Sequence, residues 1–191
     1  EWQISGYLDM ESEERMCEIS IFNFGRTICD TFVDLPLESY SKANFDEFIK
    51  YHREHNQYSN EKDIHCLICL HALQEDVSSK NFKKTDARGI GTVEFINFFQ
   101  ELHDALSGNN SKAKMSILSG DVHIMFDGSY RLSKNSEGRR VIAFNNDGNI
   151  LGVFDKNYVR CIAPSFFPGT VISIRFPLPH EWTEGSTNGN N

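Results

Sequence analysis

Strand-like segments at both ends of the chain enclose a middle part with helical periodicity, and this order restricts the fold more than any other feature. Residues 2–10 and 16–25 are apolar runs rich in β-branched and aromatic side chains, and the charged stretch between them predicts a β-hairpin. Short strand-like segments separated by turns fill the C-terminal half. The order predicts an α+β fold, with helices packed on one face of a mixed, mostly antiparallel sheet.

Three segments of the middle part have the spacing of helices. Residues 44–56 carry apolar side chains three and four positions apart, and Asn44 is the expected N-cap. Residues 61–74 are apolar almost all round, which predicts a buried helix. A third helix is expected from about Gly91 to Leu106, because large apolar side chains recur there at helical intervals.

The C-terminal half predicts a series of strands. They are expected at 114–120, 122–126, 130–133, 140–144, 150–154 and 169–178. The last segment alternates apolar and polar side chains, which is typical of a strand buried on one face. We expect residues 1–180 to form one domain with a helical insert at 28–88, and the polar residues 181–191 to form a flexible tail or linker.

Charge and cysteine content exclude several classes of partner. The chain of 191 residues has 19 Lys and Arg against 27 Asp and Glu, a net charge of −8, which argues against binding to nucleic acid or anionic membrane. No apolar run approaches the roughly 20 residues that cross a bilayer. The five cysteines lie mostly inside apolar runs, which favours a reducing, cytoplasmic location.

A glycine-rich stretch precedes the third expected helix. Gly89 and Gly91 remove Cβ atoms that would hold phosphate oxygens away from the helix N-terminus, where unpaired N–H groups favour anions. The expected phosphate-binding residues are Lys84, Arg88, Gly89, Ile90, Gly91 and Thr92. A solvated basic loop followed by an ordinary helix start explains the same pattern, so this stretch alone does not establish a site.

Three stretches, taken in order, resemble the nucleotide-binding boxes of the histidine kinase, gyrase and MutL-type ATPases, the GHKL or Bergerat-fold family. Residues 23–27, Asn-Phe-Gly-Arg-Thr, resemble the strand-end motif D-x-G-x-G of that family. Residues 89–92 resemble its G-x-G loop, which follows a lid, and 169–177 resemble its late Gly-Thr strand. The resemblance covers about 2–178 and implies a two-layer Bergerat fold with a lid at 28–88.

The resemblance also implies a ligand and residue roles. Asn23 takes the place of the aspartate that accepts a hydrogen bond from the adenine amino group, Gly25 lets the backbone pass close to the purine, and Thr170 reaches the adenine. The glycine loop would hold the phosphates of ATP, bound with Mg²⁺. Asn23 in place of Asp, and Thr27 in place of the second glycine, depart from the family pattern.

The first box of the family is a helix that carries a glutamate base and a magnesium-binding asparagine. It precedes the first strand of the hairpin, whereas this sequence begins at that strand with Glu1. We expect the chain to be a segment of a longer protein with the catalytic base upstream, and a protein partner or a fused domain. The alternative is a degenerate GHKL-fold module that binds a protein partner without catalysis.

A C-x-x-C pair lies in the second expected helix. Cys66 and Cys69, flanked by His65 and His71, could begin a zinc site or form a redox pair. A structural zinc site requires four ligands, however, and the sequence has no second C-x-x-C. Buried cysteines that act as small hydrophobic side chains explain the pattern better, so no metal site is expected.

Overall fold

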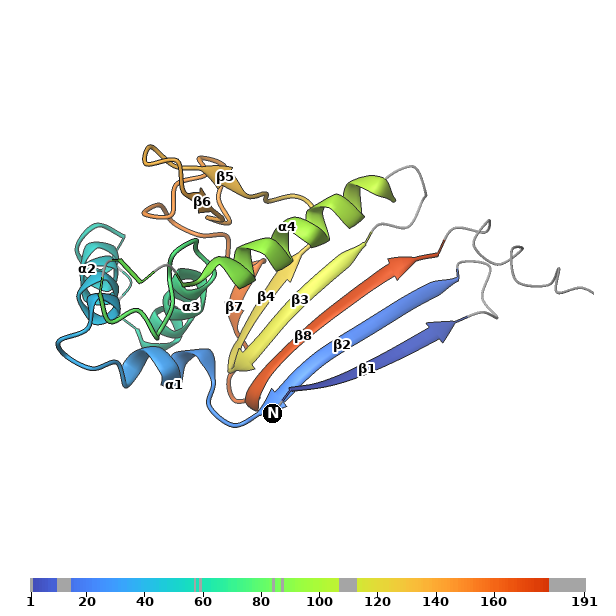
Figure 1. Ribbon diagram of the computed structural model, residues 1–191, viewed down its shortest axis with the longest axis horizontal. Helices are drawn as coiled ribbons and strands as arrows, with labels where there is room; N and C mark the ends of the chain where they lie inside the picture. The colour runs from blue at the N-terminus through green and yellow to red at the C-terminus, as the bar shows by residue number, and fades with distance from the viewer. Residues whose placement is uncertain are drawn as a thin grey trace, which may run out of the picture.

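An antiparallel sheet of six strands forms one layer of the protein, in the order β1-β2-β8-β3-β4-β7 (Figure 1). The computed structural model describes residues 2–9, 15–56, 58, 60–83, 85–86, 88–106 and 113–178. The strands are β1 (Trp2–Asp9), β2 (Met16–Phe24), β3 (Lys114–Gly120), β4 (Val122–Phe126), β5 (Ser133–Lys134), β6 (Arg140–Val141), β7 (Val159–Cys161) and β8 (Phe167–Pro177). β5 and β6 pair with each other in a separate ribbon. The predicted α+β class and N-terminal hairpin are confirmed.

Helices pack on one face of this sheet. They are α1 (Ile28–Val33), α2 (Tyr40–His55), α3 (Glu61–Ala72) and α4 (Ile90–Ala105). The predicted start of α2 was wrong: Ser39 is the N-cap, and its hydroxyl accepts a hydrogen bond from the backbone N–H of Lys42. The first turn of α2 is mostly polar, so the apolar spacing that indicated the helix begins only at Phe45. The short helix α1 was not predicted.

The predicted strands of the C-terminal half are confirmed for β3, β4 and β8, but not for the segments between β4 and β8. Residues 130–133 and 140–144 contribute only the two short strands β5 and β6, and 150–154 contains no strand. Ile142 is buried, yet its backbone N–H and C=O both bond to the side chain of Gln74. The apolar pattern at 140–144 arises because its apolar residues are buried. The backbone of Ile142 bonds to the side chain of Gln74 and not to a neighbouring strand.

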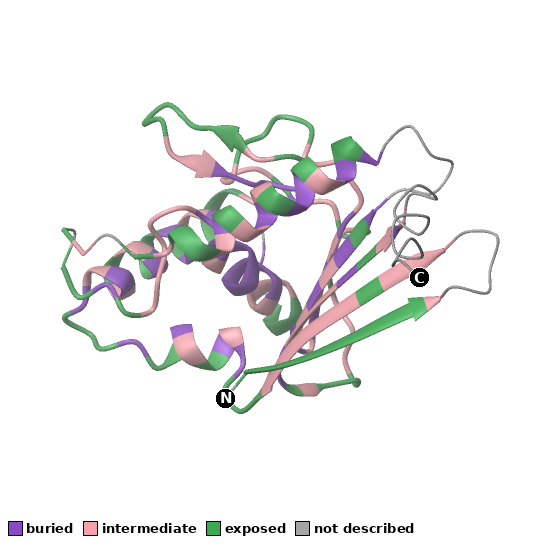
Figure 2. Ribbon diagram, turned by 45° about the vertical axis from the view of Figure 1, so that its right-hand side comes forward, coloured by how far each residue is buried: buried purple, intermediate pink, exposed green. Residues whose placement is uncertain are grey.

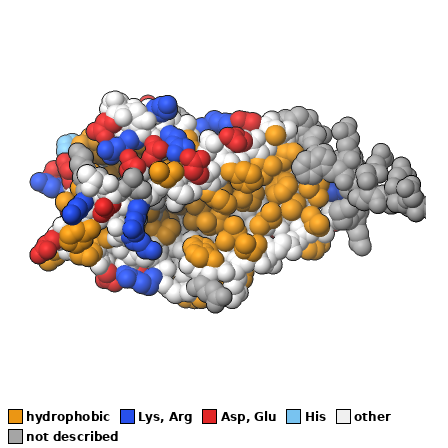
Figure 3. All heavy atoms as spheres, in the orientation of Figure 1, with side chains coloured by type: hydrophobic (Ala, Val, Ile, Leu, Met, Phe, Trp, Pro, Cys, Tyr) orange, Lys and Arg blue, Asp and Glu red, His pale blue; other side chains and the backbone are white. Residues whose placement is uncertain are grey.

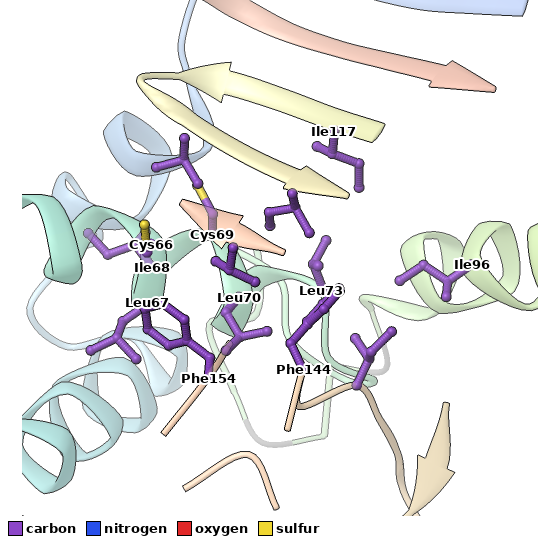
Figure 4. Packing of buried hydrophobic residues seen from close by; sticks show 14 of the residues in the cluster. Cys66, Leu67, Ile68, Cys69, Leu70, Leu73, Ile96, Ile117, Phe144 and Phe154 are labelled. Carbon is purple, nitrogen blue, oxygen red and sulfur yellow. The ribbon is translucent and has the colours of Figure 1, made fainter. Parts of the chain in front are cut away.

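The helix α3 lies at the centre of the core, as its nearly continuous apolar sequence predicts. Leu67, Leu70 and Leu73 are each at most 1% exposed, and Figure 4 shows them between the sheet and the loops that carry Phe144 and Phe154. The helix packs against β7 and β4 on one side and against α1 and α2 on the other. Part of the segment expected to be a lid therefore belongs to the main hydrophobic core.

The helical layer covers only half of the sheet face. Helices α3 and α4 lie over β3, β4 and β7, whereas β1 remains exposed along its length (Figures 1 and 2). Trp2, Ile4 and Leu8 point to the same face as the covered residues and are 54%, 75% and 56% exposed. Figure 3 shows hydrophobic side chains gathered over this open part of the sheet. None of the helices in the described ranges is both long and apolar enough to span a membrane.

The central position of α3 predicts how truncation of its side chains affects stability. We expect Leu70→Ala to lower the free energy of unfolding by about 2–5 kcal/mol, because a cavity remains in a packed core. Leu37→Ala is the matched control, since Leu37 is 86% exposed, and we expect a change within about 0.5 kcal/mol. Urea denaturation measures both, and an equal effect of the two variants would contradict this core.

His71 predicts a pH dependence of stability. Its ring stacks on Phe48 with centroids 4.6 Å apart, and burial lowers its pKa from 6.5 to about 4. Between these values the unfolded chain binds more protons than the folded one, so stability falls as the pH decreases from about 6.5 to about 4, by up to about 1.4 kcal/mol per pH unit. His71→Phe should remove this part of the slope in urea denaturation, whereas His55→Phe, at an exposed position, should not.

Candidate functional site

A cavity of about 480 Å³ lies where the covered and the open halves of the sheet face meet. Its floor is formed by the N-terminal end of β8 and the C-terminal end of β2, and its walls come from α1, the end of α3 and the start of α4. Apolar side chains of the sheet, Ile21, Ile117 and Ile172, continue from the cavity toward the open face. The cavity has the size of small-molecule sites in proteins, which span roughly 300–1,000 Å³.

The register of β2 against β8 sets the polar end of the cavity. Asn23 lies opposite Thr170, and the Asn23 Oδ1 atom accepts a hydrogen bond of 3.0 Å from the backbone N–H of Thr170. The adjacent Gly169 has φ +143°, and a Cβ on it would lie 2.0 Å from the carbonyl oxygen of Asn23. Glycine is therefore required at 169, because the two backbones approach too closely for any side chain.

Ser119 at the end of β3 joins this pair to α1. Its hydroxyl accepts a 2.9 Å hydrogen bond from the backbone N–H of Ile28 and lies 2.9 Å from the hydroxyl of Thr170. It also donates to the carbonyl of Gly169 at 3.1 Å. Since a hydroxyl has one proton, the Thr170 hydroxyl donates to Ser119 and keeps its free lone pairs for a ligand. The cavity end thus presents hydrogen-bond acceptors at Thr170 and Asn23.

The start of α4 forms the opposite wall. Gly91 and Thr92 line the cavity, and no side chain caps the helix at its N-cap residue Gly89. Glu94 lies in the second turn of the helix, where its carboxylate is 2.8 Å from Arg140 and does not cap the helix start. Uncapped N–H groups at a helix start favour a negatively charged group. One wall of the cavity is therefore suited to an anion.

The structure places the sequence-predicted residues in two groups. Asn23, Thr170, Gly91 and Thr92 line this one cavity, although they come from strands and a helix far apart in the chain. Gly25, Arg88, Gly89 and Ile90 do not line it. Lys84 lies outside the described residues, as does the expected tail at 181–191.

Other lining residues were not predicted as site residues. Arg26 lines the cavity and forms a 2.6 Å ion pair with Asp34 at the surface. Trp2 and Phe95 supply flat apolar walls from β1 and α4. Ser119 does not line the cavity and has no motif around it, and only its pairing with Thr170 across β3 and β8 reveals its role behind the lining. A wall of two aromatic side chains is suited to a planar apolar group.

The cysteines form no metal centre in the described part of the chain. All five are free thiols, and no group of three or more His, Cys, Asp or Glu side chains among the described residues is arranged to hold a metal ion. Burial raises the pKa of the Cys66 thiol. The ring of His65 instead lies 3.0 Å from Asp121. The thiols of the C-x-x-C pair therefore act as buried hydrophobic side chains.

Comparison with models of known protein families, with curated proteins and with solved structures gave no match.

Substitution of alanine for Gly89 or for Gly91, the two glycines at the start of α4, should have opposite effects on stability. A Cβ on Gly89, which has φ +104°, would lie 2.3 Å from the carbonyl oxygen of Val77, whereas a Cβ on Gly91 has no neighbour within 4 Å. We expect Gly89→Ala to lower the free energy of unfolding by more than about 2 kcal/mol. Gly91→Ala should leave it unchanged or raise it by up to about 1 kcal/mol. Urea denaturation compares them, and a stable Gly89→Ala protein would contradict the backbone contact with Val77.

Proposed function

We propose that this chain is an ATP-binding domain of the GHKL type, in which nucleotide binding is coupled to a lid or to a partner contact. The observation that carries the proposal is the shared cavity: Asn23 and Thr170, assigned to adenine, and Gly91 and Thr92, assigned to phosphate, line one space of about 480 Å³, whereas Gly25 and Gly89 do not line it. The proposal would have been excluded if Asn23 and the start of α4 lay on opposite sides of the molecule. A coincidental resemblance gives no reason for these segments to meet.

The adenine base would lie at the end of the cavity formed by β2 and β8. The purine would lie against Trp2 and Phe95, which line the cavity, and its exocyclic amine would donate to Asn23. One lone pair of Asn23 Oδ1 is occupied by the N–H of Thr170, and the second remains for a ligand. An amide accepts without the charge assistance of a carboxylate, so base binding at Asn23 is weaker than at an aspartate.

The phosphates would lie at the start of α4. The helix N-terminus supplies N–H donors, Thr92 supplies a hydroxyl, and Arg26 supplies a positive charge at the rim. The described residues contain no ligand set for a metal ion. Mg²⁺ would bind together with the nucleotide phosphates.

The proposal includes a cytoplasmic location. Five free thiols, among them Cys29 and Cys69 with sulfur atoms 3.7 Å apart and unbonded, support a reducing compartment.

A specific observation favours a second candidate function, a protein-interaction module without catalysis. The open apolar face around Ile4 and Leu8 is larger than scattered surface residues explain, and such faces mark interaction sites. Under this alternative, the Gly91→Ala variant still binds the partner protein. Neither this variant nor the unmodified protein binds nucleotide.

Calorimetric titration of ATP–Mg²⁺ tests the proposal directly. We expect saturable binding by the 191-residue chain. Gly91→Ala should weaken binding about tenfold or more, because its Cβ enters the space next to the helix N–H groups. Gly6→Ala is the matched control: Gly6 lies on β1, outside the cavity lining, where a Cβ meets nothing closer than 3.8 Å.

A second variant tests the base end. Asn23→Asp should strengthen ATP binding, by about tenfold, since a carboxylate accepts from both the Thr170 N–H and the adenine amine with charge assistance. Absence of heat at millimolar ATP rejects the nucleotide function. Binding that is indifferent to Gly91→Ala and Asn23→Asp would place the nucleotide elsewhere.

A further inference from the structure

A second cavity, of about 390 Å³, lies between α2, the end of α3 and the β5–β6 ribbon. None of its lining residues lines the first cavity, so it is a separate space. Phe48, Val141 and Ile150 give it apolar walls. Its volume also falls within the range of small-molecule sites, roughly 300–1,000 Å³.

Hydrogen bonds fix the walls of this cavity. The Gln74 amide makes two bonds of 3.0 Å to the backbone of Ile142, which ties the chain after β6 to the end of α3. The Nε2 atom of His52 lies 3.1 Å from the carbonyl of Ile150, and the Asn56 amide donates to the carbonyl of Leu151 at 2.8 Å. These bonds join the loop at 150–151 to the end of α2. The space is therefore held open before a ligand arrives, which lowers the cost of binding.

His71 supplies an unused polar group inside this cavity. The residue is only 5% exposed and lines the cavity. Within the described ranges its contacts are ring contacts with Phe48, Phe32 and Phe45, and no hydrogen bond reaches its imidazole nitrogens. Its pKa of about 4 leaves the ring neutral near pH 7, with one donor and one acceptor. The His71 nitrogens are not among the fully buried polar atoms that lack a partner, so they remain accessible from the cavity and can bond to a ligand there.

The charges around the cavity favour a positive ligand. Its lining includes the carboxylates of Glu47, Glu75 and Glu137 and one cationic side chain, Arg139. Glu75 is paired with Arg140 at 2.8 Å, and Glu137 with Arg139 at 3.4 Å. Within the described chain no ion pair involves Glu47, which leaves its carboxylate as the free counter-charge.

The spacing along α2 places further acceptors beside Glu47. Asn44, Glu47, Phe48 and Tyr51 all line the cavity, at the i, i+3, i+4 and i+7 positions of one helix face. They offer an amide, a carboxylate, an aromatic ring and a phenol along one side of a space that His71 faces from α3. This combination suits a flat apolar body that carries N–H donors and a positive charge.

We propose that the cavity between α2, α3 and the β5–β6 ribbon binds a small organic cation, an amidinium or amine on a flat apolar body. Glu47 forms the ion pair, His71 accepts or donates a hydrogen bond at the buried end, and Phe48 packs against the flat body. The proposal does not depend on nucleotide binding, because the two cavities share no lining residue.

A series of three probes of the same shape tests the charge. Benzamidine is cationic, benzamide is neutral and benzoate is anionic. Titration of each into the ¹⁵N-labelled protein, followed by amide chemical shifts, should show saturable changes at α2 and the β5–β6 ribbon for benzamidine. Benzamide should bind about tenfold more weakly and benzoate not at all. Absence of saturable shifts there up to about 20 mM benzamidine, or equal affinity for benzamide, overturns the proposal.

Substitutions test the residues. Glu47→Gln keeps the shape of an exposed side chain and should weaken benzamidine about tenfold, to the level of benzamide. Glu54→Gln is the matched control, an exposed glutamate on the same helix that does not line the cavity, and should leave affinity unchanged. His71→Phe keeps the aromatic packing and should also weaken binding. An unchanged affinity of Glu47→Gln for benzamidine overturns the proposal, whether or not His71→Phe folds.

Discussion

The pairing of β2 with β8 is the constraint on which the rest of the structure depends. Nine residue pairs run from Met16 opposite Pro177 to Phe24 opposite Gly169, in one uninterrupted register. A slip by one residue would turn every apolar side chain of the strand to the opposite face. The register also places Asn23 beside Thr170, and the missing side chain at Gly169 allows their backbones to approach. Core packing and the polar end of the first cavity thus have one common cause.

The second constraint is the one-sided position of the helices. The α3 helix fills the core over β4 and β7, and α4 runs beside it, so half of the sheet face is covered and half is open. The first cavity lies at this boundary because α1 and the start of α4 leave space above β2 and β8. A cavity at such a boundary has a rigid floor of paired strands and a wall made of helix N–H groups. Those are the two environments that a base and a phosphate chain require.

Polar groups in the protein are satisfied by a few long-range contacts. Ser119, Gln74 and His52 each bond to backbone groups of segments distant in sequence. These bonds hold the walls of both cavities without requiring regular secondary structure in the loops after β6. His71 is the contrasting case, because it is equally buried but faces an open space. Accessibility from a cavity therefore separates His71 from these structural residues as a candidate ligand contact.

The sequence by itself determined the local elements. Apolar periodicity located α3, α4, the N-terminal hairpin, β3, β4 and β8, since helix and strand spacing are properties of neighbouring residues. The sequence also indicated the glycines at 89 and 91 and the order of the three stretches that resemble the GHKL nucleotide-binding boxes. It did not reveal α1 or β7, which are too short to show a period, and it misplaced the start of α2 because its first turn is mostly polar.

Only the tertiary structure decided which of those residues meet. Asn23 and Thr170 are 147 positions apart in the chain, and Ser119, from a strand between the two in sequence, bonds to Thr170. Gly89 allows a close contact with the backbone of Val77, whereas Gly91 lines the cavity. A G-x-G motif does not distinguish these two roles. These facts depend on strand order and register, which arise from burial across the whole chain, whereas local spacing reports only the conformation of each segment.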